Sequence, residues 1–216
     1  MSTKNLTAWF LILGPLSVFA ANFLTSILIG QGETPADRIA EMTDQQALTG
    51  VFTFLASLGF VFAFIGVVLL LDSMQKIDKA GSTLARIAMI IFLALTALAI
   101  VVTMADWASL NAIQNDQVDN AITIQIVSGT LWAGLLFFWG IGFVFAGRAF
   151  TLQKRLHPVV NWICVVFGGV FVLLTVLPLD LGMFIFLVFG IMVLNIVAGG
   201  IVLFKESPKS GNDSRL

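Results

Sequence analysis

The sequence predicts an all-α membrane protein, a polytopic bundle of six transmembrane helices with both termini in the cytoplasm. Three observations lead to this prediction: an apolar composition, six apolar segments of membrane-spanning length, and a one-sided distribution of lysine and arginine. Of the 216 residues, 59% are hydrophobic and only 11% are charged, and the mean hydropathy is +1.03. Soluble domains carry about 25% charged residues. Lipid is therefore the expected solvent for most of this chain.

Six apolar segments are each long enough to cross a hydrocarbon layer as a helix, which takes about 20 residues. They cover residues 8–29, 49–71, 85–105, 122–146, 159–179 and 182–204. The first contains Gly14 and Pro15, which predict a kink. Only Asp180 and Leu181 separate the last two segments, so these are expected to form a tight antiparallel hairpin. Residues 1–206 therefore form one transmembrane domain, followed by a polar tail, 207–216, that is expected to be disordered.

The orientation follows from lysine and arginine, which cytoplasmic loops of membrane proteins retain. With the N-terminus inside, ten of the eleven basic residues are cytoplasmic: Lys4, Lys76, Lys79, Arg86, Arg148, Lys154, Arg155, Lys205, Lys209 and Arg215. Only Arg38 is outside. The outer connections carry acids instead, namely Glu33, Asp37, Glu41, Asp44, Asp106, Asp116, Asp119 and Asp180. We expect a multi-pass protein of the prokaryotic cell (inner) membrane whose outer face is electronegative.

Two features of the helical segments leave alternatives open. Val18-Phe19-Ala20 resembles the cleavage site of a signal peptide, but the apolar segment continues past Ala20, so a retained helix is favoured. The sequence Gly-Phe-Val-Phe-Ala occurs at 59–63 and again at 142–146. This recurrence indicates a parallel repeat of two helical hairpins, as some transporters show, or a chance match in a chain rich in these residues.

Two outer connections are long enough to have structure of their own. In the first, Thr34 is placed to cap a helix with Pro35 and Asp37 in its first turn. Ile39 and Thr43 follow at helical spacing, and the helix is expected to lie on the outer membrane interface. The second connection, 107–121, is rich in Asn, Gln and Asp and has no clear periodicity. The helix before this connection is expected to end at residue 105, and the helix after it is expected to begin at residue 122.

Several activities lack the residues that they require. A haem needs axial ligands, usually histidines, and the only histidine is His157 in a cytoplasmic loop. A retinal Schiff base needs a lysine within a helix, and every lysine lies outside the apolar segments. Nucleophile elbow, phosphate-binding loop and intramembrane acid pair are all missing. Cys164 stands alone in an apolar segment, as a buried small hydrophobe does. The chain is therefore expected to be no enzyme, to hold no cofactor or metal, and to bind no nucleic acid.

Uncharged polar residues gather in the outer halves of the first, second and fourth helices. If these faces point inward, they line a polar vestibule that is open to the outside. The candidate residues are Asn22, Ser26, Gln46, Thr49, Thr53, Asp106, Gln125 and Ser128. Asp106 is the charged candidate, as a cation or proton contact, although Trp107 beside it also fits an ordinary residue at the membrane rim. The alternative for the neutral residues is hydrogen bonding to neighbouring helices or to their own backbone.

In layout the whole chain resembles the small six-helix membrane proteins of unknown function encoded by bacteria and archaea. The residues that carry the resemblance are Arg38-Ile39-Ala40 and Leu48-Thr49-Gly50, where a long outer connection enters the second helix. A basic loop before the third helix completes the pattern. The resemblance implies the six-helix layout and no activity.

Two functions of different classes follow. The first is a non-enzymatic accessory protein or subunit of a membrane assembly, whose partners are the lipid bilayer and another membrane protein or a second copy of itself. The alternative is a small-molecule or ion carrier, or a ligand-binding bundle, that uses the outer vestibule. Because no charged residue occupies the expected bilayer midplane, where carriers tend to bind, the sequence favours the first.

Overall fold

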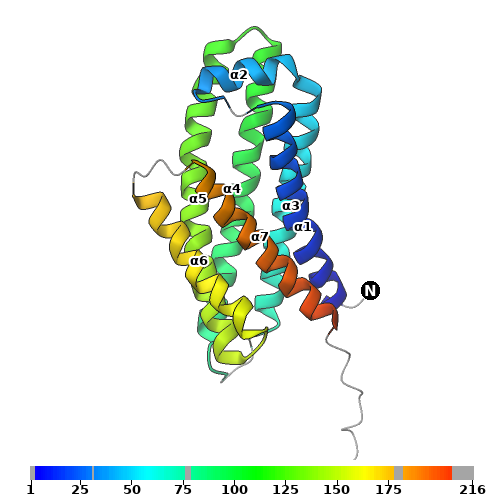
Figure 1. Cartoon of the computed structure of the whole chain (residues 1–216), viewed down its shortest axis with the longest axis vertical. Coiled ribbons are helices and arrows are strands. Elements are labelled where there is room, and N and C mark those ends of the chain that lie inside the picture. The colour runs from blue at the N-terminus through cyan, green and yellow to red at the C-terminus, as the bar shows by residue number, and fades with distance from the viewer. Residues whose placement is uncertain (1–2, 31, 76–78, 178–181, 206–216) are drawn as a thin grey trace, which may run out of the picture.

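The computed structural model describes residues 3–30, 32–75, 79–177 and 182–205, the side chains of 182–186 excepted. These residues form seven α-helices: α1 (Thr3–Leu28), α2 (Pro35–Asp44), α3 (Gln46–Asp72), α4 (Ser82–Gln114), α5 (Val118–Gln153), α6 (Pro158–Val176) and α7 (Gly182–Lys205). Figure 1 shows the six long helices side by side, with the short α2 lying across one end. The predicted turn at Asp180 and the tail 207–216 lie outside the described residues.

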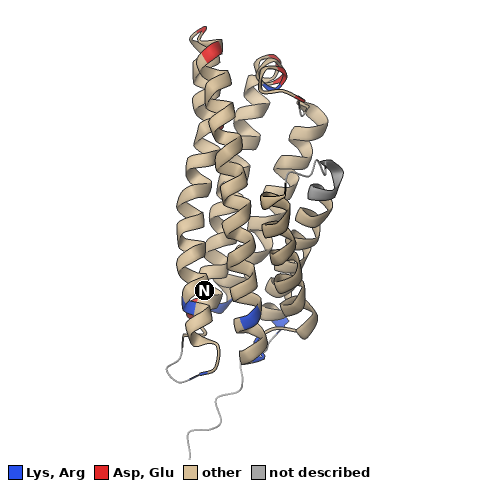
Figure 2. Cartoon of the chain, turned by 90° about the vertical axis from the view of Figure 1, so that its left-hand side faces the viewer, with Lys and Arg blue, Asp and Glu red and all other residues tan. Residues whose placement is uncertain are grey.

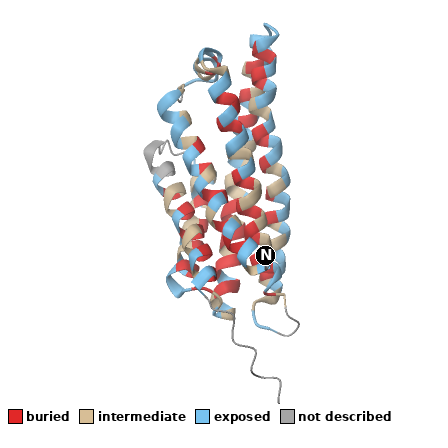
Figure 3. Ribbon diagram, turned by 90° about the vertical axis from the view of Figure 1, so that its right-hand side faces the viewer, coloured by how far each residue is buried: buried red, intermediate tan, exposed pale blue. Residues whose placement is uncertain are grey.

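Six of the seven helices are long and apolar enough to cross a membrane, all except α2. This confirms the prediction of an all-α bundle with six helices of membrane-spanning length and composition, to which α2 adds a seventh, short helix. Pro15 lies inside α1 without ending it. Nearly all of the large apolar residues that the bundle leaves exposed belong to these six helices, where lipid would cover them. In Figure 3 the buried residues follow the facing sides of the helices.

The one short helix among the seven, α2, begins as the sequence predicted. The hydroxyl of Thr34 accepts from the backbone N–H of Asp37 at 3.2 Å, and the backbone N–H of Thr34 donates to the Asp37 carboxylate at 3.0 Å. This reciprocal capping box satisfies two N–H groups that a helix start leaves open. Ile39 and Met42 are the buried side chains of α2. The helix therefore packs onto the end of the bundle by one short apolar face.

The described charged residues lie toward the two ends of the bundle, as the coloured ribbon of Figure 2 shows. The end that carries α2 and the α4–α5 connection holds acids together with Arg38, whereas the opposite end holds the start of α1, the end of α7 and the other described basic residues. Lys76, Lys209 and Arg215 lie outside the described residues. The two ends are called the acidic end and the basic end below.

The predicted ends of the third and fourth spanning helices are wrong. We expected helices over 85–105 and 122–146, but α4 continues to Gln114 and α5 begins at Val118. The connection is only residues 115–117. Leu110 and Ile113 of α4 form a small apolar cluster with Ala121 of α5 and the buried face of α2. This cluster stabilises the helical extension, while the Asn, Gln and Asp residues between these positions face solvent.

The spanning helices pack mainly against their chain neighbours, and α7 returns to α1. The closest approach is between α1 and α3, where a Cβ built on Gly14 would lie 2.4 Å from the backbone nitrogen of Ala63. A Cβ on Gly59 would lie 2.8 Å from the carbonyl oxygen of Gly14. Small residues let helix backbones touch in this way inside a membrane. The repeated segments 59–63 and 142–146 therefore differ in their partners, since Gly142 instead meets the side chains of Ile91 and Phe92.

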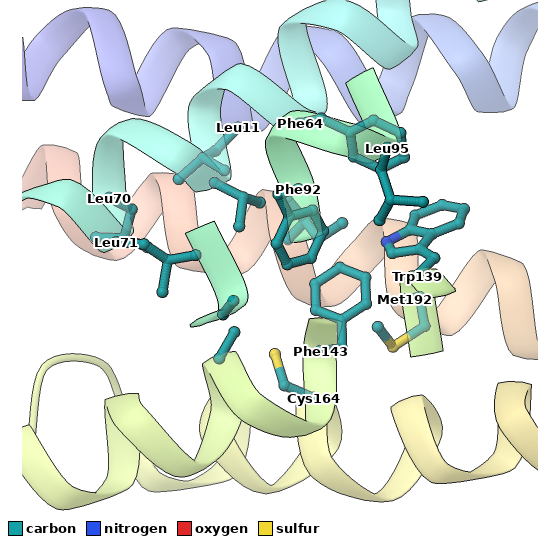
Figure 4. Packing of buried hydrophobic residues seen from close by; sticks show 14 of the residues in the cluster. Leu11, Phe64, Leu70, Leu71, Phe92, Leu95, Trp139, Phe143, Cys164 and Met192 are labelled. Atoms are coloured by element: carbon teal, nitrogen blue, oxygen red, sulfur yellow. The ribbon is translucent and has the colours of Figure 1, made fainter. Parts of the chain in front are cut away.

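Aromatic rings fill the core in the basic half and at mid-depth (Figure 4). The ring of Trp139 stacks on Phe171 at 5.6 Å between centroids and meets Phe64 edge-on at 5.3 Å. Phe92 and Phe143 continue the cluster at 5.1 Å. The indole N–H of Trp139 has no hydrogen-bond partner among the described residues. A phenylalanine core avoids adding hydroxyl groups that would also need partners there, and the chain has 20 phenylalanines and no tyrosine.

Candidate functional site: a polar cavity at the acidic end

The cavity forms where the two C-terminal helices stop. Gly140 of α5 packs on Gly168 of α6, and Gly147 of α5 packs on Asn161 of α6. Because the two helices are antiparallel, Val176, the last residue of α6, comes level with about residue 132 of α5 at the common rise of about 1.5 Å per residue. Beyond that level the bundle consists of α1, α3, α4 and α5, covered by α2 (Figure 1).

A cavity of about 400 Å³ lies between these five helices. Its polar lining includes Asn22 and Thr25 of α1, Thr49 and Thr53 of α3, Thr103 and Asp106 of α4, and Gln125 and Ser128 of α5. Arg38 and Glu41 line it from α2, and Phe52, Ala56 and Trp132 supply apolar walls. The volume lies within the usual range of small-molecule sites, about 300–1,000 Å³.

Asp106 and Gln125 join α4 to α5 at the wall of the cavity. The Gln125 amide donates to a carboxylate oxygen of Asp106 at 3.1 Å and to the hydroxyl of Ser109 at 3.0 Å. It also approaches the sulfur of Met42 on α2 at 4.0 Å. Gln125 and Ser109 are buried, and Asp106 is half-buried. One amide therefore fixes the carboxylate in place and connects three helices.

Arg38 brings the opposite charge to the same cavity. It lies on α2, half-buried, and its positive charge acts on the Asp106 carboxylate. Arg38 forms no ion pair with any acid that the structure describes. A guanidinium has five N–H donors and no acceptor, so its donors remain available to a ligand. The cavity lining thus holds one cation, Arg38, and three carboxylates, those of Glu33, Glu41 and Asp106, and Arg38 forms no ion pair with any of them.

Glu41 holds the connection between α1 and α2 against this lining. Its carboxylate accepts the backbone N–H of Gly32 at 2.7 Å. Gly30 lies beside the same carboxylate with a φ of +111°, which favours glycine, and a Cβ there would come within 2.5 Å of a Glu41 oxygen. Glu41 is therefore occupied in positioning α2, unlike Arg38.

The neutral polar residues divide into two groups. The side chains of Asn22, Thr49 and Thr103 donate to carbonyl oxygens one turn earlier in their own helices, at 2.8, 3.0 and 2.8 Å. This is the backbone bonding that the sequence left as the alternative. The hydroxyls of Thr53 and Ser128 have no such bond within the described part of the chain, and both line the cavity. These two hydroxyls can therefore bond to a ligand.

The structure brings six of the eight candidate vestibule residues to one cavity: Asn22, Thr49, Thr53, Asp106, Gln125 and Ser128. The other two lie elsewhere, which corrects the prediction. Ser26 is exposed on another face of α1. Gln46 lies in a shallow groove between α3 and α4 that also includes Trp107 and Phe54. Both differences have the same cause: residues three or four positions apart still differ by about 60° or 40° around the helix axis, which is enough to carry a side chain past the edge of a narrow lining face.

Sequence reasoning missed Arg38 and Met42 as parts of the site. Arg38 was recognised only as the single basic residue outside, and the structure places it over the cavity. A lone cation on an otherwise acidic face was the signal that could have identified it. The sequence contains no such signal for Met42, because its role depends on how α2 lies across the bundle.

The tryptophans place the cavity near the boundary of the membrane, since tryptophan concentrates at the headgroup level. Trp107 is exposed one position after Asp106, and Trp162 is exposed one position after Asn161, which packs on Gly147. On α5 these levels correspond to residues 125 and about 146, a separation of about 31 Å along the helix axis. The hydrocarbon core of a bilayer is about 30 Å thick. The two exposed tryptophans are thus about one hydrocarbon thickness apart, and the cavity, at the acidic end, is level with Trp107.

Neither a metal site nor a known relative adds to this description. In the described part of the chain, no group of three or more His, Cys, Asp or Glu side chains is placed to hold a metal ion. Comparison with protein-family models, with curated proteins and with solved structures found no match to this chain. The argument for a function therefore rests on the cavity itself.

Proposed function

We propose that the chain is a non-enzymatic, multi-pass protein of the cell membrane, with both termini in the cytoplasm, that binds a small zwitterionic group in the cavity at its outer end. The observation that carries the proposal is the pair of unpaired opposite charges, Arg38 and Asp106, on one cavity of about 400 Å³. A ligand with an anionic group and an ammonium group would satisfy both charges at once.

The orientation supports a site that faces outward. Lysine and arginine collect at the basic end, which the positive-inside rule places in the cytoplasm. The cavity is at the other end. A binding bundle of this kind fits a carrier or a sensor of its ligand.

This proposal replaces the accessory subunit as the favoured function. The groove between α3 and α4, lined by Val51, Phe54 and Trp107 among others, is the surface that a partner helix would use. Its part below Trp107, along Val51, Phe54 and Leu55, is apolar, so lipid chains would cover that part as well as a partner would. The cavity instead contains charges and free hydroxyls, which lipid chains cannot satisfy.

Native mass spectrometry of the protein released gently from its own membrane tests the proposal. We expect the wild-type chain to retain a small molecule or lipid, and Arg38→Gln and Asp106→Asn to lose it. Asp106→Asn is informative because an asparagine oxygen can still accept from Gln125, so the wall of the cavity is kept. Asp119→Asn is the matched control, since Asp119 lies exposed in the first turn of α5. A wild-type chain that carries no small molecule and a stoichiometric protein companion would contradict the proposal and favour the subunit.

A further inference from the structure

We infer that the cavity opens sideways into the outer leaflet, between α1 and α5, and that its ligand is a zwitterionic phospholipid or a similar amphiphile. The head of the amphiphile would lie between Arg38 and Asp106, and its chains would remain in the bilayer. This inference rests on the proposed binding function and deepens it by naming the class of ligand and its route.

The first support is the face of α1 that α7 covers only in part. Gly200 of α7 packs on Ala8 and Ile12. A Cβ added to Gly190 of α7 would lie 3.8 Å from the ring of Phe19. On the same face, Phe23 and Ser26 follow one and two turns later, and both are exposed. Among the described side chains, the contact with α7 thus ends near Phe19, and Phe23 and Ser26 beyond it are exposed beside the cavity.

The second support is the matching face of α5. Gly147 and Gly140 pack on α6, and the same face continues through Ala133 to Gly129. Ala133 and Gly129 are exposed, and an added Cβ on Gly129 would meet nothing within 4 Å. Gly129 also lines the cavity. The side of the cavity along α5 is therefore open, on the same side of the bundle as the uncovered face of α1.

The third support is the lack of contact between these two helices. α1 packs on α3 and α7, α5 packs on α4 and α6, and no substantial contact joins α1 to α5. In Figure 1, α7 crosses the space between them diagonally, from beside α5 near mid-height down to the start of α1, and α2 covers the top. The cavity lies between these two levels.

The depth of the cavity gives the class of ligand. The Trp107 level places Asp106 at the boundary between hydrocarbon and headgroups, so the opening faces the region where a phospholipid changes from chains to head. A water-soluble solute would have to enter past α2, whereas a lipid of the outer leaflet already has its head at this depth. Phosphate binds arginine through paired N–H donors, and an ammonium group complements the Asp106 carboxylate. A phosphoethanolamine head carries both groups.

A bulky side chain at Gly129 tests the opening without disturbing the packing. Gly129→Trp would fill open space at the mouth of the cavity. Gly134→Trp is the matched control, because Gly134 is on the same helix, an added Cβ there also meets nothing within 4 Å, and it does not line the cavity. Both variants should fold, which circular dichroism and elution of a single species would verify.

The wild-type chain and both variants would be placed in nanodiscs of phosphatidylglycerol with a minor share of phosphatidylethanolamine, and the lipid retained after release would be measured by native mass spectrometry. We expect the wild-type and Gly134→Trp chains to retain phosphatidylethanolamine about tenfold above its share of the bilayer, a preference of about 1.4 kcal/mol. Gly129→Trp should retain lipid in the proportions of the bilayer. Equal enrichment in Gly129→Trp, or none in the wild type, would overturn the inference.

Glycerophosphoethanolamine, the same head without chains, separates this inference from the proposed function. We expect millimolar glycerophosphoethanolamine to leave the thermal unfolding of the wild-type chain unchanged. If it stabilises the wild type but not Arg38→Gln, while no lipid is enriched, the cavity binds a soluble zwitterion and only the membrane route is wrong. If neither the lipid nor the soluble head binds, the proposed function fails as well.

Discussion

Gln125 is the residue whose replacement most directly tests the construction of the site. Its amide donates to Asp106 at 3.1 Å and to Ser109 at 3.0 Å, and it is 8% exposed. Gln125→Leu keeps a similar side-chain volume and removes both donors. We expect the variant to fold and to be less stable than the wild type.

The loss in the free energy of unfolding depends more on the lost bond to Asp106 than on the lost bond to Ser109. A hydrogen bond to a charged group is worth about 1.5–3 kcal/mol, and the half-buried carboxylate accepts no second side-chain hydrogen bond from the described residues. Ser109 loses less, because a serine within a helix can turn its hydroxyl to a carbonyl one turn earlier. Burial of the leucine offsets part of the loss. We therefore expect a decrease of about 2 kcal/mol in the free energy of unfolding, set mainly by the charged bond.

Equilibrium unfolding in mixed micelles measures this difference. For a chain of about this length, 2 kcal/mol corresponds to a decrease in Tm of about 4–8 °C. Thr130→Val is the control, since Thr130 is exposed on α5 and its hydroxyl bonds only weakly, at 3.4 Å, within its own helix. We expect the control to change the Tm by less than a quarter of that amount.

A double-mutant cycle decides whether the loss passes through Asp106. In an Asp106→Ala background the bond to the carboxylate is already absent, so Gln125→Leu should cost less than about 1 kcal/mol there, and the coupling energy should lie within about 0.5–3 kcal/mol. The reasoning would be refuted by the same cost in both backgrounds, because Gln125 would then act through packing and not through the carboxylate.

Three further predictions concern the frame around the cavity. Gly59→Leu should destabilise the bundle by about 1–3 kcal/mol through overpacking, since its Cβ would meet backbone of α1 at 2.8 Å; Gly134→Leu, into open space, should not, and micelle unfolding compares them. Asn195→Leu should change stability by less than about 1 kcal/mol, because the amide donates to Val160 and Cys164 but its buried oxygen has no partner among the described residues; a loss above 2 kcal/mol in the same assay would contradict this. Thr34→Ala should remove about 1 kcal/mol of capping energy and speed amide exchange in α2 while exchange in α4 and α5 stays the same.

The spanning helices could be predicted from the sequence because lipid imposes a strong pattern on it. A segment that must bury about 20 consecutive backbone units in hydrocarbon has few charges, and that pattern needs no knowledge of neighbours. The extension of α4 and α5 beyond the membrane could not be predicted in this way. Its buried positions include Ser109, Ala112 and Ala121, whose small side chains hardly stand out from the polar residues between them.

The site could be predicted in part for a related reason. The faces that carry Thr49, Thr53, Gln125 and Ser128 are visible as helical spacing, so their meeting in one cavity could be expected if the faces point inward. Arg38 could not be assigned to it, because its place depends on the angle at which α2 crosses the bundle. The sideways opening could not be predicted either, since it results from how far α6 and α7 reach along α5.

The orientation of the whole chain decides which leaflet can supply the ligand, and single cysteines can establish it. Cys164 is the only cysteine and is 3% exposed in the packed core, so the wild-type chain should give almost no reaction with a membrane-impermeant maleimide. Asn115→Cys places a thiol at the exposed tip between α4 and α5, and Lys79→Cys places one at the basic end. We expect Asn115→Cys to react in intact cells and Lys79→Cys to react only after lysis. The reverse result would put the cavity on the cytoplasmic side, and the phospholipid would then have to come from the inner leaflet.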